Sequence, residues 1–393
     1  MTRPLEGVTV VSLEHAIAAP FCTRQLADLG ARVIKIERPG VGDFARAYDA
    51  RVKGQASHFV WTNRSKESLT LDLKNADAMA ALQQLIGKAD VLVQNLAPGA
   101  TARMGLSYDD LRVQHPGLIV CDISGYGEDG PYRDKKAYDL LIQSEAGFLS
   151  ITGTPESPSK AGNSVADIAA GMYAYTNILS ALLLRGKTGQ GSHIDVSMLE
   201  ALGEWMGYPM YYAFDGAAPP PRSAAAHASI YPYGPFPAGD GGTIMLGLQN
   251  EREWKVFCEK VLLQTDLATD ARFASNALRN QNREALRALI VSAFAALSTE
   301  QVEQRLETAQ IANARMNDMA GLWAHPQLKS RARWREVGSP AGAIPALLPP
   351  GRNSAFDYRM DPIPQVGEHT DAILQELGLS SDAIQALRTA QAI

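Results

Sequence analysis

Short apolar runs alternate with amphipathic segments over roughly the first third of the chain. Buried-type strands are predicted at residues 7–13, 31–37, 68–73, 90–94 and 118–123, and helices at residues 21–30 and 76–87. A strand, a helix and a second strand in succession are typical of a parallel sheet. The pattern therefore predicts a doubly wound α/β fold for this part of the chain.

The middle of the chain carries a long helix followed by a strand. A helix is predicted from Asp167 to Arg185, and a strand at residues 192–198. The sequence GKTGQG at residues 186–191 lies between them. A phosphate-binding loop needs a glycine where Ala181 stands, so we interpret these glycines as a helix end and a turn.

A change of composition at residues 215–223, DGAAPPPRS, marks a linker. Beyond it the pattern predicts strands at 229–236 and 242–247, helices at 251–263, 283–296 and 299–309, a strand-like stretch at 341–350 and a helix at 370–378. We predict a large α/β, Rossmann-like domain at 1–200 completed by 340–393, a linker at 201–223, a small α+β domain at 224–328 and a return linker at 329–339.

The composition is that of an ordinary globular protein. Of the 393 residues 46% are hydrophobic and 20% are charged, which excludes a disordered chain, and the net charge of −5 favours neither nucleic acid nor an anionic membrane. The longest apolar run, near residues 178–184, is too short to span a bilayer. Three dispersed cysteines and a start without a signal-peptide pattern predict a cytoplasmic protein.

Several common catalytic motifs are missing. The histidines and cysteines have no metal-ligand spacing, so we predict no metal, and no GxSxG elbow supports a serine hydrolase. The turn at residues 15–20 lacks GxGxxG. A dinucleotide site is therefore weakly indicated, although Glu37 ends the second predicted strand.

Asp167 is the most informative single residue. It opens a helix of small residues directly after a Gly-Asn-Ser turn. An aspartate at this place is commonly a helix cap, and it can also act as a nucleophile that a large ligand approaches closely. Local sequence leaves both interpretations open.

Basic residues gather near the ends of the predicted strands. At the carboxyl edge of a parallel sheet they could hold phosphates, although scattered cations are more often solvated surface. The set is Arg38, Arg46, Arg64, Lys66, Lys74 and Arg103.

Seven segments in order resemble the class III coenzyme A transferases, the family that contains formyl-CoA transferase. They include PLEGVTVVSLEHAIAAPFCTRQLADLGARVIKIERPGVGDFAR, NRSKESLTLDLK, ADVLVQNLAPGATARMGL, ISGYGEDGPYRDKKAYDLLIQSEAG, RGKTGQGSHIDVSMLEA after Asp167, YPYGPF with DGGTIMLG, and VGEHTDAILQELG. Each is weak alone, and the ordered set along nearly the whole chain is specific.

The resemblance implies a carboxylate nucleophile at Asp167 and coenzyme A thioesters as substrates, with no prosthetic group. It also implies an active-site loop at His15 and Ala16. Small residues after Asp167 would let the thioester approach, and amides at the helix start would stabilise oxyanions. The CoA-binding positions that carry over are Arg38, Leu71, Lys74, Asn95, Arg103, Met104, Lys136 and Tyr138.

The chain departs from the formyl-CoA branch at two places. Ile17 stands where that branch has glutamine, and residues 222–231 stand roughly where it has a glycine-rich loop, which disfavours formate and oxalate. The run IANARMND at 311–318 resembles the branch that handles C4–C5 dicarboxylates. We therefore expect transfer of CoA from succinyl-CoA to itaconate, with mesaconate, citramalate and formate or oxalate as alternatives. Candidates for a second carboxylate are Arg46, Arg222 and Arg315.

Two other functions remain open at this point. A 2-methylacyl-CoA racemase of the same fold has a histidine before an aspartate where this chain has Tyr138 and Asp139, and tyrosine is a poor base at neutral pH. A nonenzymatic CoA-binding protein would keep the cations and would not need Asp167. The family resemblance also implies a homodimer in which two chains interlock as rings.

Overall fold

The computed structural model describes residues 2–393 and divides into two compact units. Unit 1 contains the chain up to Ala146, together with Ala161–Met206 and Leu328–Ile393. Unit 2 contains Gly147–Lys160 and Gly207–Gln327. Each unit is described by itself.

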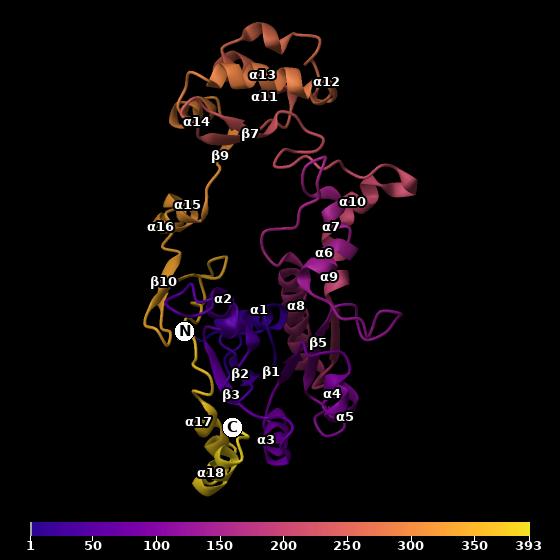
Figure 1. Ribbon diagram of the computed structural model, residues 1–393, viewed down its shortest axis with the longest axis vertical. Helices are drawn as coiled ribbons and strands as arrows, with labels where there is room; N and C mark the ends of the chain where they lie inside the picture. The colour runs from indigo at the N-terminus through magenta and orange to yellow at the C-terminus, as the bar shows by residue number, and fades with distance from the viewer. Residues whose placement is uncertain (1) are drawn as a thin grey trace. The chain divides into compact units, whose positions relative to one another are not determined.

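A six-stranded parallel sheet forms the centre of unit 1 (Figure 1). Its order is β3-β2-β1-β4-β5-β6, the order of a doubly wound sheet, and it confirms the predicted parallel α/β fold. The strand order reverses between β1 and β4, where the loops after the two strands diverge. The strands are β1 (Thr9–Leu13), β2 (Arg32–Glu37), β3 (Lys66–Thr70), β4 (Val91–Gln94), β5 (Ile119–Ser124) and β6 (His193–Ser197).

Helices complete unit 1, and a two-stranded antiparallel ribbon joins them. The ribbon consists of β10 (Trp334–Val337) and β11 (Ile344–Leu347). The helices are α1 (Ala18–Asp28), η1 (Phe44–Ala47), α2 (Ser57–Thr62), α3 (Ala76–Ile86), α4 (Ala100–Arg103), α5 (Tyr108–Leu111), α6 (Asp139–Glu145), α8 (Val165–Thr188), α9 (Met198–Trp205), α17 (Thr370–Glu376) and α18 (Ser381–Thr389).

Two element boundaries differ from the sequence prediction for clear reasons. Helix α1 begins at Ala18 rather than residue 21, because Pro20 lies in the first turn, where its missing N–H has no intrahelical partner. Strand β3 begins at Lys66 rather than residue 68. Lys66 and Ser68 are buried although they are polar. A hydrophobic pattern therefore does not mark the start of this strand.

Unit 2 is built on a three-stranded antiparallel sheet in the order β7-β8-β9. Phe236, Trp254, Phe257 and Phe273 lie in its core. The strands are β7 (Tyr233–Pro237), β8 (Thr243–Gly247) and β9 (Ala312–Arg315), and the helices are α7 (Phe148–Ile151), α10 (Gly207–Tyr212), η2 (Phe214–Gly216), α11 (Glu251–Val256), η3 (Phe257–Leu262), η4 (Thr265–Ala268), α12 (Asn276–Gln281), α13 (Arg283–Phe294), α14 (Thr299–Thr308) and α15 (Met319–Trp323). Helix α16 (Pro326–Ser330) lies where the chain leaves unit 2.

Helix α8 ends as the glycine pattern predicted. Its last residue is Thr188, and Gly189 follows in the left-handed conformation with its N–H donating to the Arg185 carbonyl at 2.7 Å. The turn then enters β6. This geometry confirms the helix-end interpretation of residues 186–191.

The N-terminal half of α8 packs directly on α1. Ala169, Ala170 and Ala174 are fully buried, and a Cβ added at Gly171 would lie 2.7 Å from the Ala18 carbonyl oxygen. The small residues after Asp167 therefore let two helices approach each other. The prediction that they give a thioester room is wrong for these positions.

Helix α8 is also long and apolar enough to cross a membrane by length and composition alone, contrary to the short apolar run read from the sequence. Its first half packs on α1, and the helix also contacts α6 and α9 within unit 1. Packing inside the unit accounts for the apolar residues of the N-terminal part, whereas Leu183 and Leu184 near the other end are 73% and 56% exposed.

Two glycines of α8 provide a matched test of this packing. Gly171→Ala is expected to lower the free energy of unfolding by about 1–3 kcal/mol, because the new methyl group meets backbone. Gly186→Ala meets nothing within 4 Å and is expected to raise it by up to about 1 kcal/mol. Urea unfolding of both variants measures the difference. Equal effects would contradict the close approach of α1 and α8.

Candidate active site

Asp167 lies in the first turn of α8, and a second carboxylate caps that helix. The Asp139 Oδ1 atom accepts hydrogen bonds from the amides of Ala166 at 2.8 Å and Asp167 at 3.4 Å. Its Oδ2 atom accepts from Gln143 Nε2 at 2.6 Å. Among the described residues, none donates a hydrogen bond to the Asp167 carboxylate or forms an ion pair with it. The cap is thus Asp139, and the interpretation of Asp167 as a helix cap is wrong.

The environment of Asp167 makes its carboxyl group unusually basic. Burial, and then the neighbouring Asp139 carboxylate, raise the pKa of Asp167 to about 7. A carboxylate with a raised pKa and no hydrogen-bond donor keeps its lone pairs available for attack on a carbonyl carbon. The sequence analysis expected amides at the helix start to stabilise oxyanions. The amides of Ala166 and Asp167 already donate to Asp139, so these two are not available for that role.

The loop after β1 lies at the switch point of the sheet and is tied to the loop after β4. The His15 amide donates to Asn95 Oδ1 at 2.8 Å, and Asn95 Nδ2 donates back to the His15 carbonyl at 2.9 Å. Ala16 has a φ of 60°, in the left-handed region, and its amide donates to Asp43 Oδ1 at 3.3 Å. The structure thus brings the predicted residues His15, Ala16 and Asn95 together.

Tyr48 continues a row of aromatic rings that begins at His15, and sequence reasoning missed it. Its ring lies 5.8 Å from that of Phe44, which lies 5.2 Å from the His15 ring. Burial raises the pKa of Tyr48, with smaller contributions from Asp43, Asp167 and Tyr138. Tyr138, also predicted, is 73% exposed. Only the fold could place Tyr48 here, because nothing in its local sequence marks it.

Buried ion pairs contact the loop that carries His15 and Ala16. Lys35 Nζ lies 2.9 Å from Asp43 Oδ2 and 3.2 Å from Glu14 Oε1, and Lys66 Nζ lies 2.7 Å from Glu14 Oε1. All four side chains have no solvent exposure. Asp43 Oδ1 also accepts from the amides of Ala16 and Ala45, so the pairs are linked to the His15–Ala16 loop.

Two cations predicted at strand ends are therefore structural. Burial lowers the pKa of Lys66 to about 8, and its ammonium group lies in the core rather than at a ligand site. Arg64 pairs with Asp28, with Nη2 to Oδ2 at 2.7 Å, and both are buried. The hypothesis that these two residues hold phosphates is wrong.

The remaining predicted CoA-binding residues lie at or near the carboxyl edge of the sheet. Arg38, Lys74, Arg103 and Lys136 are exposed, and none of these four forms an ion pair with a carboxylate of the described chain. Met104 is half-buried against the core. The Leu71 side chain is 2% exposed and packs in the core, which leaves only its backbone for a ligand.

The three arginines suggested for a second carboxylate already have partners. Arg46 Nη2 lies 2.6 Å from Glu37 Oε2, and its Nε donates to Oε1 at 2.9 Å. Arg222 donates to the carbonyls of Thr154 and Pro155. Arg315 pairs with Glu303. These contacts give each guanidinium a structural role.

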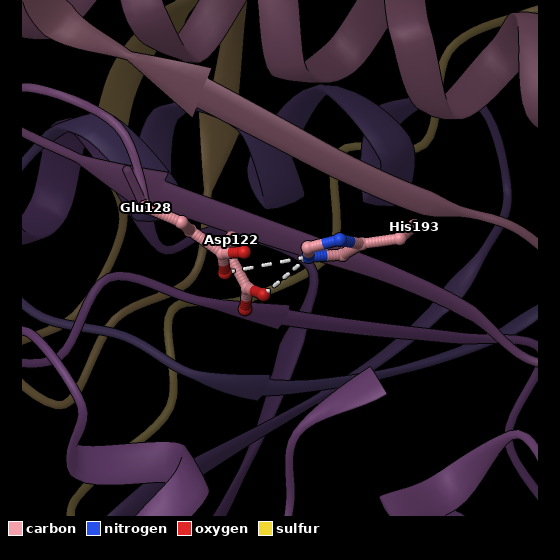
Figure 2. A group of neighbouring side chains, drawn as sticks. All are labelled: Asp122, Glu128 and His193. Atoms are coloured by element: carbon pink, nitrogen blue, oxygen red, sulfur yellow. Dashed lines mark hydrogen bonds and ion pairs between the residues drawn. The ribbon is translucent and has the colours of Figure 1, made fainter. Parts of the chain in front are cut away.

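A second polar group in unit 1 escaped the sequence analysis (Figure 2). His193 Nε2 lies 2.7 Å from Asp122 Oδ2 and 3.4 Å from Glu128 Oε1, at a cleft of about 620 Å³. Tyr108 stacks on the His193 ring at 5.4 Å. Burial, followed by the contact with Asp122, raises the pKa of Glu128 to about 7.

The donor set of Asp122, Glu128 and His193 is one that also suits a divalent cation, since their ligand atoms lie within 4.8 Å of one another. The three side chains satisfy one another here, so their contacts do not require a cation. Sequence spacing did not reveal the group because the sheet joins residues far apart in the chain.

Comparison with known proteins decides the family. Residues 5–370 match the sequence profile of CoA-transferase family III. The chain belongs to CoA-transferase family III. This membership confirms the resemblance read from the sequence and makes the protein a CoA-transferase, whose substrates are CoA thioesters and which uses no prosthetic group.

Named relatives and a solved structure agree with this assignment. The chain is 34% identical to the succinate–glutarate CoA-transferase of Agrobacterium fabrum, over 95% of this chain and 96% of that one. It is 30% identical to the succinyl-CoA–D-citramalate CoA-transferase of Chloroflexus aurantiacus, over 100% of this chain and 98% of that one. It is 37% identical to the acetyl-CoA:oxalate CoA-transferase of Acetobacter aceti, over 74% of this chain and 75% of that one. A CAIB/BAIF family protein from Brucella suis superposes with a TM-score of 0.86 at 32% identity, over 96% and 100% of the chains.

Lys35→Met tests the buried ion pairs. The substitution leaves Asp43 uncompensated in the core, and we expect the free energy of unfolding to fall by about 3–5 kcal/mol. Arg112→Met, which removes an exposed pair with Asp109, is the control and should change it by less than about 1 kcal/mol. Urea unfolding gives both values. Similar small effects would show that the buried pairs contribute little.

The raised pKa of Asp167 predicts a pH-dependent stability. Its ordinary pKa of 3.8 rises to about 7 on folding, so the folded protein binds this proton more tightly than the unfolded chain. That contribution is fully present below pH 3.8 and is lost as the pH rises through about 7. Asp167→Asn should therefore gain stability relative to the natural protein between pH 5 and pH 8. Urea unfolding at several pH values measures the difference in free energy of unfolding between the two proteins. A difference that stays constant from pH 5 to pH 8 would contradict the raised pKa.

Proposed function

We propose that the enzyme transfers CoA from succinyl-CoA to a C4–C5 dicarboxylate, itaconate first among them, through a covalent intermediate at Asp167. The observation that carries the proposal is the half-buried Asp167 carboxylate, which has no hydrogen-bond donor among the described residues and a pKa raised to about 7. The Asp167 charge contributes to the raised pKa of Tyr48, whose ring lies in a row with those of Phe44 and His15. A carboxylate in such a setting is suited to nucleophilic attack.

In the proposed reaction an Asp167 oxygen attacks the thioester carbonyl of succinyl-CoA, and the CoA thiolate leaves. The resulting mixed anhydride is attacked at the aspartyl carbonyl by the thiolate, which releases succinate and forms an aspartyl–CoA thioester. The acceptor carboxylate then attacks that thioester, forming a second anhydride and freeing the thiolate again. The thiolate attacks the acceptor's acyl carbon, which yields the new thioester and restores the Asp167 carboxylate.

The surroundings of Asp167 suit both halves of this cycle. The Asp139 carboxylate raises the basicity of Asp167 without occupying its oxygens, since it is bonded to the helix amides and Gln143. The exposed guanidinium and ammonium groups of Arg38, Lys74 and Arg103 are available to the phosphates of CoA. Exclusion of water by the bound thioester would protect the anhydride from hydrolysis.

The acceptor is the finer part of the proposal. The relatives from Agrobacterium and Chloroflexus carry the names of C4–C5 dicarboxylates together with succinate or succinyl-CoA. The run at 311–318 resembles the branch for C4–C5 dicarboxylates, among which we choose itaconate, and glutarate is the acid against which itaconate must be compared. Oxalate, named for the Acetobacter relative, is the third acid to test.

The assembly and compartment are also proposals. Exposed apolar side chains in and after α10 of unit 2, at Tyr208, Met210, Tyr211 and Phe214, support burial against a second copy, in keeping with an interlocked homodimer. Cys22, Cys121 and Cys258 are free thiols, which fits a reducing cytoplasm.

The test combines product analysis with trapping of the intermediate. The enzyme is incubated with succinyl-CoA and itaconate, glutarate or oxalate, and new thioesters are identified by mass spectrometry. Asp167→Asn is expected to lose about 10³-fold or more of the activity, because the amide is a poor nucleophile. Digestion of the natural enzyme after succinyl-CoA alone should give the Asp167 peptide with CoA attached by loss of water.

Asp129→Asn is the matched control, since Asp129 is exposed, and it should keep full activity. Itaconyl-CoA formed faster than glutaryl-CoA supports the chosen acceptor. Glutaryl-CoA formed faster moves the acceptor to glutarate. An active Asp167→Asn variant, or exchange of the α-proton of a 2-methylacyl-CoA without any transfer, would overturn the proposed mechanism.

A further inference from the structure

A small cavity lies within unit 2, beside the segment 222–231 that stands where the formyl-CoA branch has its glycine-rich loop. Its volume is about 260 Å³. The segment before β7 forms one wall and helix α13 the other. Its lining consists of residues 223–226, Tyr231, Pro235, Arg283, Glu284 and Arg287.

Two guanidinium groups face this cavity from one side of α13. Arg283 and Arg287 are four residues apart, so they lie on the same face of the helix and repel each other. No ion pair joins either one to a carboxylate of residues 2–393. The two like charges are therefore held together without a counter-charge from the described protein.

The protein fixes the two groups but does not use up their donors. Arg283 Nη2 donates to the His227 carbonyl at 2.9 Å and to Asn280 Oδ1 at 2.8 Å, while its buried Nε has no acceptor. Arg287 Nη1 donates to the Pro235 carbonyl at 2.9 Å. A buried donor without an acceptor is unfavourable unless a ligand or water completes it.

A buried phenol provides a third donor at the cavity. Tyr231 is 3% exposed and lines the cavity, and its hydroxyl makes no hydrogen bond of ordinary geometry, although the nearby Arg287 guanidinium acts to lower its pKa. The Arg283 guanidinium lies 4.9 Å from the centre of the Tyr231 ring, which holds the two groups side by side. Burial raises the pKa of Tyr231 to about 12, so the hydroxyl keeps its proton at neutral pH.

Only one acidic side chain lines the cavity. Glu284 is exposed, and it forms no ion pair with the described residues. Two cations, one peripheral carboxylate and a neutral phenol leave a net positive charge around a hollow with room for a small organic molecule. Cavities of this size suit ligands of a few carbon atoms rather than a nucleotide.

We propose that this cavity binds the carboxylate of a small organic acid, with Arg283, Arg287 and Tyr231 as the ligand-binding side chains. The planar guanidinium matches a carboxylate through two parallel hydrogen bonds, and the phenol adds a third. The proposal concerns unit 2 alone and does not depend on Asp167 or on the acceptor acid.

Calorimetric titration of the full chain, without CoA, tests the site. Succinate, itaconate and glutarate are titrated in low salt, with inorganic phosphate as a separate probe. We expect saturable binding of the carboxylates, weakened about tenfold or more in Tyr231→Phe, which removes only the hydroxyl, and in Arg283→Gln and Arg287→Gln. Arg272→Gln is the matched control, because Arg272 pairs with Asp270 outside the cavity. The Arg272→Gln variant should bind the carboxylates with unchanged affinity.

Thermal unfolding of each variant shows that the protein remains folded, and Arg283→Lys serves if Arg283→Gln does not fold. Asp167→Asn should bind the carboxylates with unchanged affinity, which separates this site from the proposed reaction. Affinities that stay the same in all cavity variants would overturn the proposal. Phosphate binding at equal or higher affinity than every carboxylate would overturn the assignment of the ligand class.

Discussion

The ion pairs beneath the switch point of the sheet are the interaction on which the candidate active site depends. Lys35 on β2 and Lys66 on β3 meet Glu14 and Asp43, which lie in the loops after β1 and β2. All four groups are shielded from water, so each is tolerable only while its partner is in place. The arrangement ties the strand ends to the loop that carries His15 and Ala16.

This loop adopts a backbone conformation that is unfavourable for its sequence. Ala16 lies in the left-handed region, where residues other than glycine are uncommon, and the Asp43 carboxylate accepts its amide. The pair with Lys35 holds Asp43 in position to accept that hydrogen bond. A loop fixed in advance does not have to be ordered when a substrate arrives, which favours catalysis.

Two carboxylates at the start of α8 have taken different roles because their surroundings differ. Asp139 accepts hydrogen bonds from two amides and a glutamine, which hold it in place at the helix start. Asp167, in the first turn of the helix, is half-buried without a donor, and its pKa is raised by burial and by Asp139. The same residue type thus gives one carboxylate engaged in capping and one with a raised pKa and free oxygens.

The sequence by itself determined the parallel sheet, the glycine end of α8, the family and the position of Asp167, because these depend on local periodicity, turn residues and ordered motifs. It did not reveal that Asp139 caps α8, that Lys66 and Arg64 are buried in ion pairs, or that Tyr48 packs near Phe44 and His15. Nor did it assign residues 147–160 to unit 2 or bring Tyr231 to Arg283. A charged side chain looks the same in sequence whether it faces water or a buried partner. Only the fold sets its burial and its neighbours, and these decide whether it stabilises the protein or carries out chemistry.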